Sequence, residues 1–120
     1  MIKTVKDLIV YNRAYKLAME IFELTKMFSV EEKYSLIDQI RRSSRSVPIN
    51  IREGYAKRQY EQVFIRHLND SLGSVEETKG WLDFSFDCKY ISGDAHKRLI
   101  LEYDEVGAMI YTLMKTWHKV

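Results

Sequence analysis

The chain contains very little of what ends or interrupts regular secondary structure. One proline and five glycines occur in 120 residues, and these residue types are the strongest markers of turns between short elements. Their scarcity argues against a fold of many short strands and favours a few long elements. Long hydrophobic runs are also missing. No stretch of the sequence approaches the roughly 20 apolar residues of a membrane-spanning helix, and the N-terminus lacks the apolar segment of a secretory signal peptide.

Cysteine is equally scarce, because Cys88 is the only one in the sequence. A single cysteine cannot form an internal disulfide, and such usage is typical of proteins in reducing compartments. We therefore expect a cytoplasmic protein. Asp87 and Lys89 flank Cys88, which is not the strongly positive environment of a reactive thiolate. We expect Cys88 to be a packed side chain rather than a nucleophile.

The residues that are abundant fit one globular domain. Apolar residues make up 46% of the chain and charged residues 30%, which fills a small core and leaves a well-solvated surface. We therefore expect a single domain over residues 1–120. The net charge of +2 does not by itself point to a partner.

Four segments carry apolar residues at the three- and four-residue spacing of a helix face, and no segment alternates with the period of a strand. We predict helices over about 6–28, 30–53, 60–89 and 93–118. The predicted buried faces are Tyr11, Ala14, Ala18, Ile21, Thr25 and Phe28; Leu36, Ile37, Ile40, Val47 and Ile51; Phe64, Leu68, Ser71, Val75, Thr78 and Leu82; and Leu99, Tyr103, Val106, Ile110, Leu113 and Trp117. Short connections make successive helices antiparallel. The predicted fold class is all-α, an antiparallel up-down-up-down four-helix bundle.

Local signals shape the second helix. Ser29 with Glu32 three residues later matches a capping box, which predicts a helix beginning directly after Ser29. Gly54 predicts its end, because glycine adopts a left-handed cap at little cost. Pro48 lies between them, and proline removes a backbone donor and clashes with the preceding turn. Since the apolar spacing continues past Pro48, we predict a continuous, kinked helix with serine hydroxyls near the carbonyl of Ser44.

The most distinctive stretch is residues 39–54, which read QIRRSSRSVPINIREG. This stretch resembles the signature of the 23S rRNA intervening-sequence protein family, whose members read close to QIRRAAxSIPxNIAEG there. Shorter pieces at residues 7–10, 64–66, 72–74 and 90–92 are similar to the same family. The resemblance therefore covers nearly the whole chain.

The resemblance implies an up-down-up-down bundle that assembles as a homopentamer. The family's genes occur within intervening sequences of bacterial large-subunit rRNA genes, among other places. A related branch, the accessory variability protein of diversity-generating retroelements, is a pentameric barrel that binds nucleic acid and a reverse transcriptase. RNA, DNA or a reverse-transcriptase-type protein are the partners that this implies. The chain departs from the family pattern at Ser43, Ser44 and Arg52, and Gln59 and Tyr60 replace a more usual serine-containing helix cap.

The sequence holds no pattern that carries a known chemistry. A di-iron bundle needs a glutamate three residues before a histidine on two helices, and none of His67, His96 and His118 has one. A ribonuclease-type Arg-x-x-x-x-His pattern, a glycine-rich phosphate loop and a Gly-x-Ser-x-Gly turn are also missing. We expect no enzyme activity, no cofactor and no bound metal.

Basic residues are concentrated in residues 41–66, the basic segment, which carries a net charge of +5 and leaves −3 for the rest of the chain. On a helix, positions 41, 45 and 52 fall within about 40° of one another, and arginine suits two-pronged contacts with phosphate. One hypothesis is a nucleic-acid-binding surface formed by Arg41, Arg45, Arg52, Lys57 and Arg58. The alternative is a structural or protein-interaction module that binds no nucleic acid, whose arginines form salt bridges with acidic residues of a neighbouring subunit.

The third helix carries a second face that calls for explanation. Trp81 and Phe84 lie off its apolar seam, and Gly73 and Gly80 near the same side permit a close backbone approach. An outward apolar face of this kind indicates a subunit interface, although a broad core seam would also account for it. We expect a non-enzymatic homo-oligomer, a pentamer by family resemblance, with an interface at Gly73, Gly80, Trp81 and Phe84.

Overall fold

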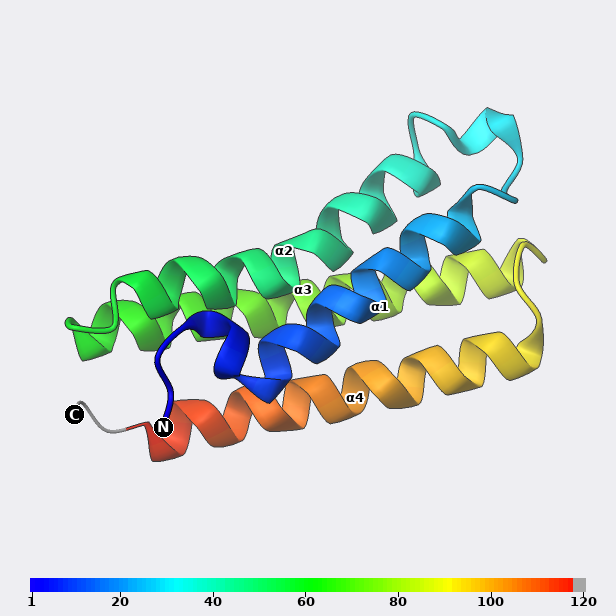
Figure 1. The fold of residues 1–120 in the computed structure, drawn as a ribbon. Helices are drawn as coiled ribbons and strands as arrows, with labels where there is room; N and C mark the ends of the chain where they lie inside the picture. Colours follow the sequence, from blue (N-terminus) through cyan, green and yellow to red (C-terminus); the bar gives the residue numbers. More distant parts are fainter. Residues whose placement is uncertain (118–120) are drawn as a thin grey trace.

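The structure, a computed structural model, describes residues 1–117. Its long helices are α1 (Ile9–Thr25), α2 (Leu36–Ala56), α3 (Glu61–Asp87) and α4 (Gly93–Thr116), and two single turns of 3-10 helix, η1 (Val5–Asp7) and η2 (Val30–Glu32), precede α1 and α2. Successive helices run antiparallel, so that the N-terminus and the end of α4 lie together (Figure 1). The predicted all-α four-helix bundle is confirmed, and residues 1–117 contain no strand.

Each helix buries the face that its residue spacing predicts. The predicted positions of the first three helices are all buried. On α4 the buried positions end at Ile110, while Leu113 and Trp117 pack against the core and stay partly exposed. Fully burying a large apolar side chain contributes roughly 1.5–3 kcal/mol, so these faces are what holds the bundle together. The predicted fourth helix extends to residue 118, which lies outside the described residues.

Small residues let α2 and α3 pack closely. The hydroxyl of Thr78 donates to that of Ser43 at 2.9 Å across the two helices. A Cβ atom added at Gly54 would lie 2.6 Å from Cβ of His67 and 2.9 Å from the ring of Phe64. The prediction that Gly54 ends the helix is therefore wrong, because α2 continues to Ala56 and Gly54 lies inside it, buried against α3. Glycine is needed here for close approach and not for a turn.

Pro48 lies inside α2 without ending it, as predicted, and α2 changes direction near its middle (Figure 1). Serine hydroxyls do lie near the bend, but they bind the carbonyls of Arg41 and Val47 and not the carbonyl of Ser44 that the prediction named. The Ser44 hydroxyl donates to the carbonyl of Arg41 at 3.1 Å, and the hydroxyl of Ser71 on α3 donates to the carbonyl of Val47 at 2.8 Å. Both carbonyls precede Pro48, so these bonds fix the backbone on the N-terminal side of the proline.

The start of α2 differs from the prediction. Ser29 caps only η2, by accepting a hydrogen bond from the backbone of Glu31, and α2 begins later, at Leu36. The carboxylate of Glu32 does not reach back to Ser29. Instead it accepts from the Ser35 hydroxyl at 2.6 Å and from the Leu36 backbone at 3.5 Å. Glu32 therefore accepts from one free backbone donor in the first turn of the helix that follows it, which begins at Leu36.

Candidate nucleic-acid interface

Arg41 connects α2 to the C-terminal end of α1. Its Nε donates to the Thr25 hydroxyl at 2.8 Å, and a terminal nitrogen donates to the Phe22 carbonyl at 3.3 Å. Its guanidinium carbon lies 4.6 Å from the centre of the Phe22 ring. Carbonyls at a helix C-terminus carry partial negative charge, which a cation stabilises. Arg41 is partly buried, so it contributes to the fold as well as to the charge of this surface.

Arg45 and Arg52 are more open than Arg41. The guanidinium carbon of Arg45 lies 5.7 Å from the Phe22 ring, and that of Arg52 lies 5.9 Å from the Tyr11 ring. Arg52 also donates to the Tyr11 hydroxyl at 3.1 Å. Both arginines are exposed, and a guanidinium placed over a ring keeps further N–H donors along its edge. The structure thus brings Arg41, Arg45 and Arg52 to one seam, where α2 packs on α1.

Lys57 and Arg58 lie at the end of α2, as its C-cap residue and the residue after it. A terminal nitrogen of Arg58 donates to the carbonyl of Tyr55 at 2.9 Å, and the guanidinium carbon lies 4.0 Å from the Tyr55 ring. Arg58 thereby caps the carbonyls at the C-terminus of α2. Of the five predicted basic residues, three pack on α1, whereas Arg58 packs on the end of its own helix.

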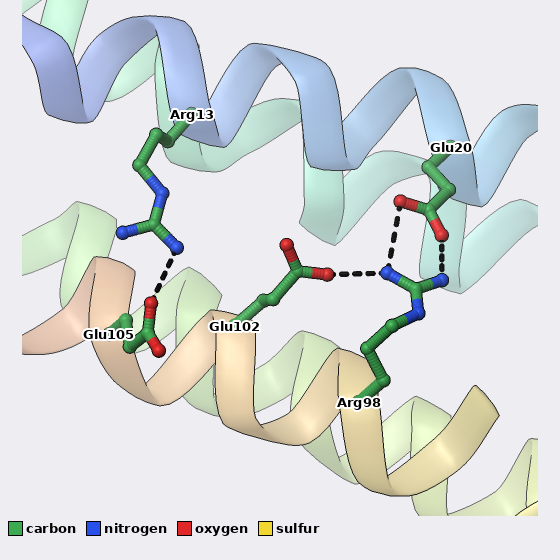
Figure 2. Close-up of polar contacts among 5 residues, drawn as sticks. All are labelled: Arg13, Glu20, Arg98, Glu102 and Glu105. Carbon is green, nitrogen blue, oxygen red and sulfur yellow. Dashed lines mark hydrogen bonds and ion pairs between the residues drawn. The ribbon is translucent and has the colours of Figure 1, made fainter. Parts of the chain in front are cut away.

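Ion pairs connect α1 to α4 on another side of α1 (Figure 2). Arg13 of α1 pairs with Glu105 at 2.7 Å, and Arg98 of α4 pairs with Glu20 of α1 and with Glu102 of its own helix. The eight arginines of the chain therefore fall into two groups. Arg13 and Arg98 pair with carboxylates, whereas the six arginines of the basic segment form no salt bridge within residues 1–117.

The aromatic side chains of α1 are the part of this surface that sequence reasoning missed. Tyr11 is buried in the core, as predicted, but its contact with Arg52 was not anticipated, and Tyr15 and Phe22 were given no role. The three positions are spaced by four and seven residues, which places them on one helix face. Tyr11 and Phe22 lie under guanidinium groups, and Tyr15 is 54% exposed. That spacing, set beside the arginine spacing of α2, was the signal that could have found them.

The face of α3 predicted as an interface lies on the outside of the chain. Phe84 is 57% exposed, and Trp81 is partly buried with its ring centre 5.7 Å from that of Phe84. The indole N–H of Trp81 donates to Glu77 at 3.1 Å. A Cβ atom at Gly73 or Gly80 would meet nothing within 4 Å. Within one chain Gly73, Gly80 and Phe84 are therefore open, whereas Trp81 is partly buried and packs against the core.

Cys88 is exposed, although it was predicted to be packed. It lies at the end of α3, is exposed, and lines an open groove between α3 and the start of α2 together with Trp81 and Phe84. The expectation of a packed thiol is wrong because α3 ends at Asp87, and Cys88 follows as a cap residue outside the buried seam.

The described residues contain neither a metal-binding cluster nor a helix that could span a membrane. Residues 1–117 hold no group of three or more His, Cys, Asp or Glu side chains placed to bind a metal ion. Nε2 of His96 lies 2.8 Å from Asp83, Nδ1 of His67 lies 3.5 Å from the side-chain oxygen of Asn50, and His118 lies outside the described residues. Among the described helices, none has the length and apolar character to cross a membrane.

Comparison with known proteins shows a family match and similar solved structures. Residues 6–112 match the family model of the 23S rRNA-intervening sequence protein, whereas no curated protein matches the chain. Among solved structures, the chain is similar to a protein of unknown function of the S23 ribosomal protein family from Bacteroides thetaiotaomicron. The TM-score is 0.81 and the sequences are 28% identical over 90% of this chain and 96% of that one. Because the family match spans α1, α2, α3 and most of α4, the chain belongs to the 23S rRNA-intervening sequence protein family.

Proposed function

We propose that the protein is a non-enzymatic, homo-oligomeric helical scaffold that binds nucleic acid through the seam between α1 and α2. Its ligand groups are the backbone phosphates, and the contacts come from Arg45 and Arg52, with Arg41 beside them. Lys57 and Arg58 extend the positive charge at the end of α2. A nucleic-acid enzyme such as a reverse transcriptase is a further partner that this surface would bring to the same nucleic acid.

One observation carries the proposal: the arginines of the basic segment have no carboxylate partner within residues 1–117, while Arg13 and Arg98 do. Arg45 and Arg52 instead lie over aromatic rings. A ring attracts the face of a guanidinium but does not cancel its charge. The charge and the N–H edge therefore remain available to phosphate oxygens, which guanidinium groups bind in a two-pronged geometry.

Assembly of several copies would multiply this effect. The net charge is only +2 per chain, but a symmetric oligomer repeats the +5 of the basic segment in every subunit, and summed potentials of this kind steer nucleic acid to a surface. We propose that the copies meet through the open face of α3, at Gly73, Gly80, Trp81 and Phe84, and we expect a pentamer from the family resemblance.

The experiment compares two double variants that remove the same charge from two sides of α1. In Arg45→Ala/Arg52→Ala the open arginines are lost, and in Arg13→Ala/Arg98→Ala the ion-paired ones are lost. Binding of a labelled oligonucleotide is measured by fluorescence anisotropy against salt concentration. Each phosphate contact contributes about 0.7–0.9 to the slope of log K against log salt. We expect the first variant to lose roughly two such contacts per binding subunit and the second to lose none.

Equal losses in both variants would contradict the proposal, because they would reflect net charge alone. Measuring the oligomeric state of both variants tests the alternative function, a module that binds no nucleic acid. If the arginines form salt bridges with acidic residues of a neighbouring copy, the wild type binds no oligonucleotide even at low salt, and Arg45→Ala/Arg52→Ala dissociates the oligomer. If the proposal holds, that variant keeps the oligomeric state of the wild type.

A further inference from the structure

Tyr15 is the one aromatic residue of the α1 stripe that no guanidinium covers in the described chain. Tyr11, Tyr15 and Phe22 share one face of α1, because they are four and seven residues apart on a helix of 3.6 residues per turn. Arg52 lies over Tyr11, and Arg41 and Arg45 lie over Phe22.

Tyr15 itself is held in place without being covered. Its ring centre lies 6.1 Å from that of Tyr11 at an interplanar angle of 49°. The side chain is 54% exposed, so the tilt against Tyr11 leaves ring surface open to solvent.

The sequence of α2 explains why no arginine covers Tyr15. The arginine stripe runs through positions 41, 45 and 52, and the turn between the last two carries Pro48 and Ile49. Ile49 is 49% exposed, while Pro48 before it is buried. Because α1 and α2 are antiparallel (Figure 1), the contacts of Arg45 with Phe22 and of Arg52 with Tyr11 place Tyr15 beside the stretch between the two arginines. Along the helices, Tyr15 and the exposed Ile49 therefore both lie at levels between Arg45 and Arg52.

We propose that this seam binds single-stranded nucleic acid, with one base stacked on Tyr15 against Ile49 and the flanking phosphates held by Arg45 and Arg52. This inference rests on the proposed function and adds the class of nucleic acid. Arg45 and Arg52 are about 10 Å apart along the helix axis, from the rise of 1.5 Å per residue, which leaves room for a nucleotide between them. Bases in a duplex are stacked on one another, whereas those of a single strand are free to stack on a protein ring.

The experiment separates stacking on the bases from attraction to the phosphates. The probes are a single-stranded oligonucleotide of about 12 nucleotides, the same strand with abasic sites in place of its bases, and the corresponding duplex. They are tested on the wild type, on Tyr15→Leu, which removes the ring but stays apolar, and on Tyr15→Phe, which keeps the ring. Tyr111→Leu is the matched control, because Tyr111 on α4 is 53% exposed.

We expect the wild type to bind the intact strand at least about fivefold more tightly than the abasic strand, as loss of one stacked base predicts. Tyr15→Leu should lose that difference, while Tyr15→Phe and Tyr111→Leu should retain it. Binding to the duplex should be indifferent to all three substitutions.

The outcomes distinguish the two levels of the proposal. If no probe binds at low salt, the proposed function is itself wrong and this inference falls with it. If the intact and abasic strands bind equally to the wild type, or if Tyr15→Leu leaves their difference unchanged, phosphate binding stands and the stacking site is wrong. Equal binding of both strands by the wild type would decide against the stacking site even if Tyr15→Leu does not fold.

Discussion

The two seams of α1 hold their charges in different ways. Towards α4, Arg13 and Arg98 pair with carboxylates, and the guanidinium groups point at the acids across the seam (Figure 2). Towards α2, Arg41 is held by a hydroxyl, a carbonyl and an aromatic ring, and Arg45 and Arg52 lie over rings. The first seam neutralises its arginines, whereas the second fixes them in position and leaves their charge uncompensated.

This difference is the basis for the proposed binding role of the second seam. An exposed ion pair contributes only about 0.2–1 kcal/mol to stability, but it occupies the N–H donors that a phosphate would need. Neutral partners orient the arginine side chain and leave its positive charge in place, because hydroxyls, carbonyls and aromatic rings carry no formal negative charge. A surface of the second kind attracts anions, and a surface of the first kind does not.

The contacts of the α1–α2 seam require that α3 holds α2 at a fixed position. Of the substitutions considered, we expect Gly54→Ala, which disturbs the packing of α2 on α3, to reduce stability most. The added Cβ would meet His67 at 2.6 Å and Phe64 at 2.9 Å, and overpacking of a core contact costs typically 1–3 kcal/mol. We expect a loss of about 2 kcal/mol in the free energy of unfolding, measured by urea denaturation, despite the better helix propensity of alanine. A neutral or stabilising result would show that α2 and α3 can move apart.

Substituting one arginine from each seam tests whether the two seams contribute differently to stability. Arg41→Met should cost about 1–2 kcal/mol, because it deletes two hydrogen bonds from a partly buried cation, and Arg98→Met about 0.2–1 kcal/mol. Urea denaturation at about 0.05 M and about 1 M salt checks the mechanism. Salt screens exposed ion pairs, so the Arg98→Met loss should shrink and the Arg41→Met loss should persist. The opposite salt dependence would contradict the assignment of the two seams.

The bundle was predictable from the sequence because its information is local and repetitive. The seam from Phe64 to Leu82 keeps helical spacing over many turns, so a single misjudged residue does not change the assignment. The element ends were less predictable, because Glu32 and Gly54 each fit two structural roles. Glutamate at that position can reach back to Ser29 or forward to Leu36, and a glycine can end a helix or allow two helices to approach.

The candidate interface was predictable only in part. Its arginines share one helix, and periodicity alone placed Arg41, Arg45 and Arg52 on one face. Their surroundings were not predictable, because the rings under them come from α1, and the pairing of positions on two helices depends on how the helices pack. The exposure of Cys88 was missed because α3 ends at Asp87, two residues before the predicted end at residue 89.

A smaller effect is expected at Gly80 on the outer face of α3, which belongs to neither seam of α1 and is part of the proposed subunit interface. A Cβ at Gly80 meets nothing within 4 Å, and alanine is favoured over glycine inside a helix by about 0.5–1 kcal/mol. We expect Gly80→Ala to stabilise the isolated chain by that amount, as measured by urea denaturation at low protein concentration. If sizing at high concentration shows a weakened oligomer, the backbone of another copy approaches Gly80, as the proposed interface requires. An unchanged oligomer would remove Gly80 from that interface.

Glu32 shows whether the use of neutral partners extends to a carboxylate. It lies in η2 and joins three parts of the chain, because it accepts hydrogen bonds from the Ser35 hydroxyl, from the Leu36 backbone and from the hydroxyl of Tyr90 at 3.0 Å. The Ser35 hydroxyl, followed by that of Tyr90, lowers the pKa of Glu32 below its ordinary value of 4.5. The charged form of Glu32 is therefore the form that the fold favours.

Glu32→Gln should change stability least of these substitutions, and the direction in which this change varies with pH follows from the lowered pKa of Glu32. Since the folded pKa of Glu32 is lowered, its contribution to stability is present above the ordinary pKa and is lost as the pH falls through the folded value. The variant should be slightly less stable than the wild type at about pH 7, and the gap should close as the pH is lowered below the ordinary pKa of 4.5. Thermal unfolding of both proteins across this range measures the gap, and Glu31→Gln, which removes the same charge at the neighbouring residue, corrects for net charge. A gap that stays constant or widens towards acid pH would mean that the neutral partners of Glu32 do not favour its charged form, and the analogy with the arginines of the α1–α2 seam would fail for carboxylates.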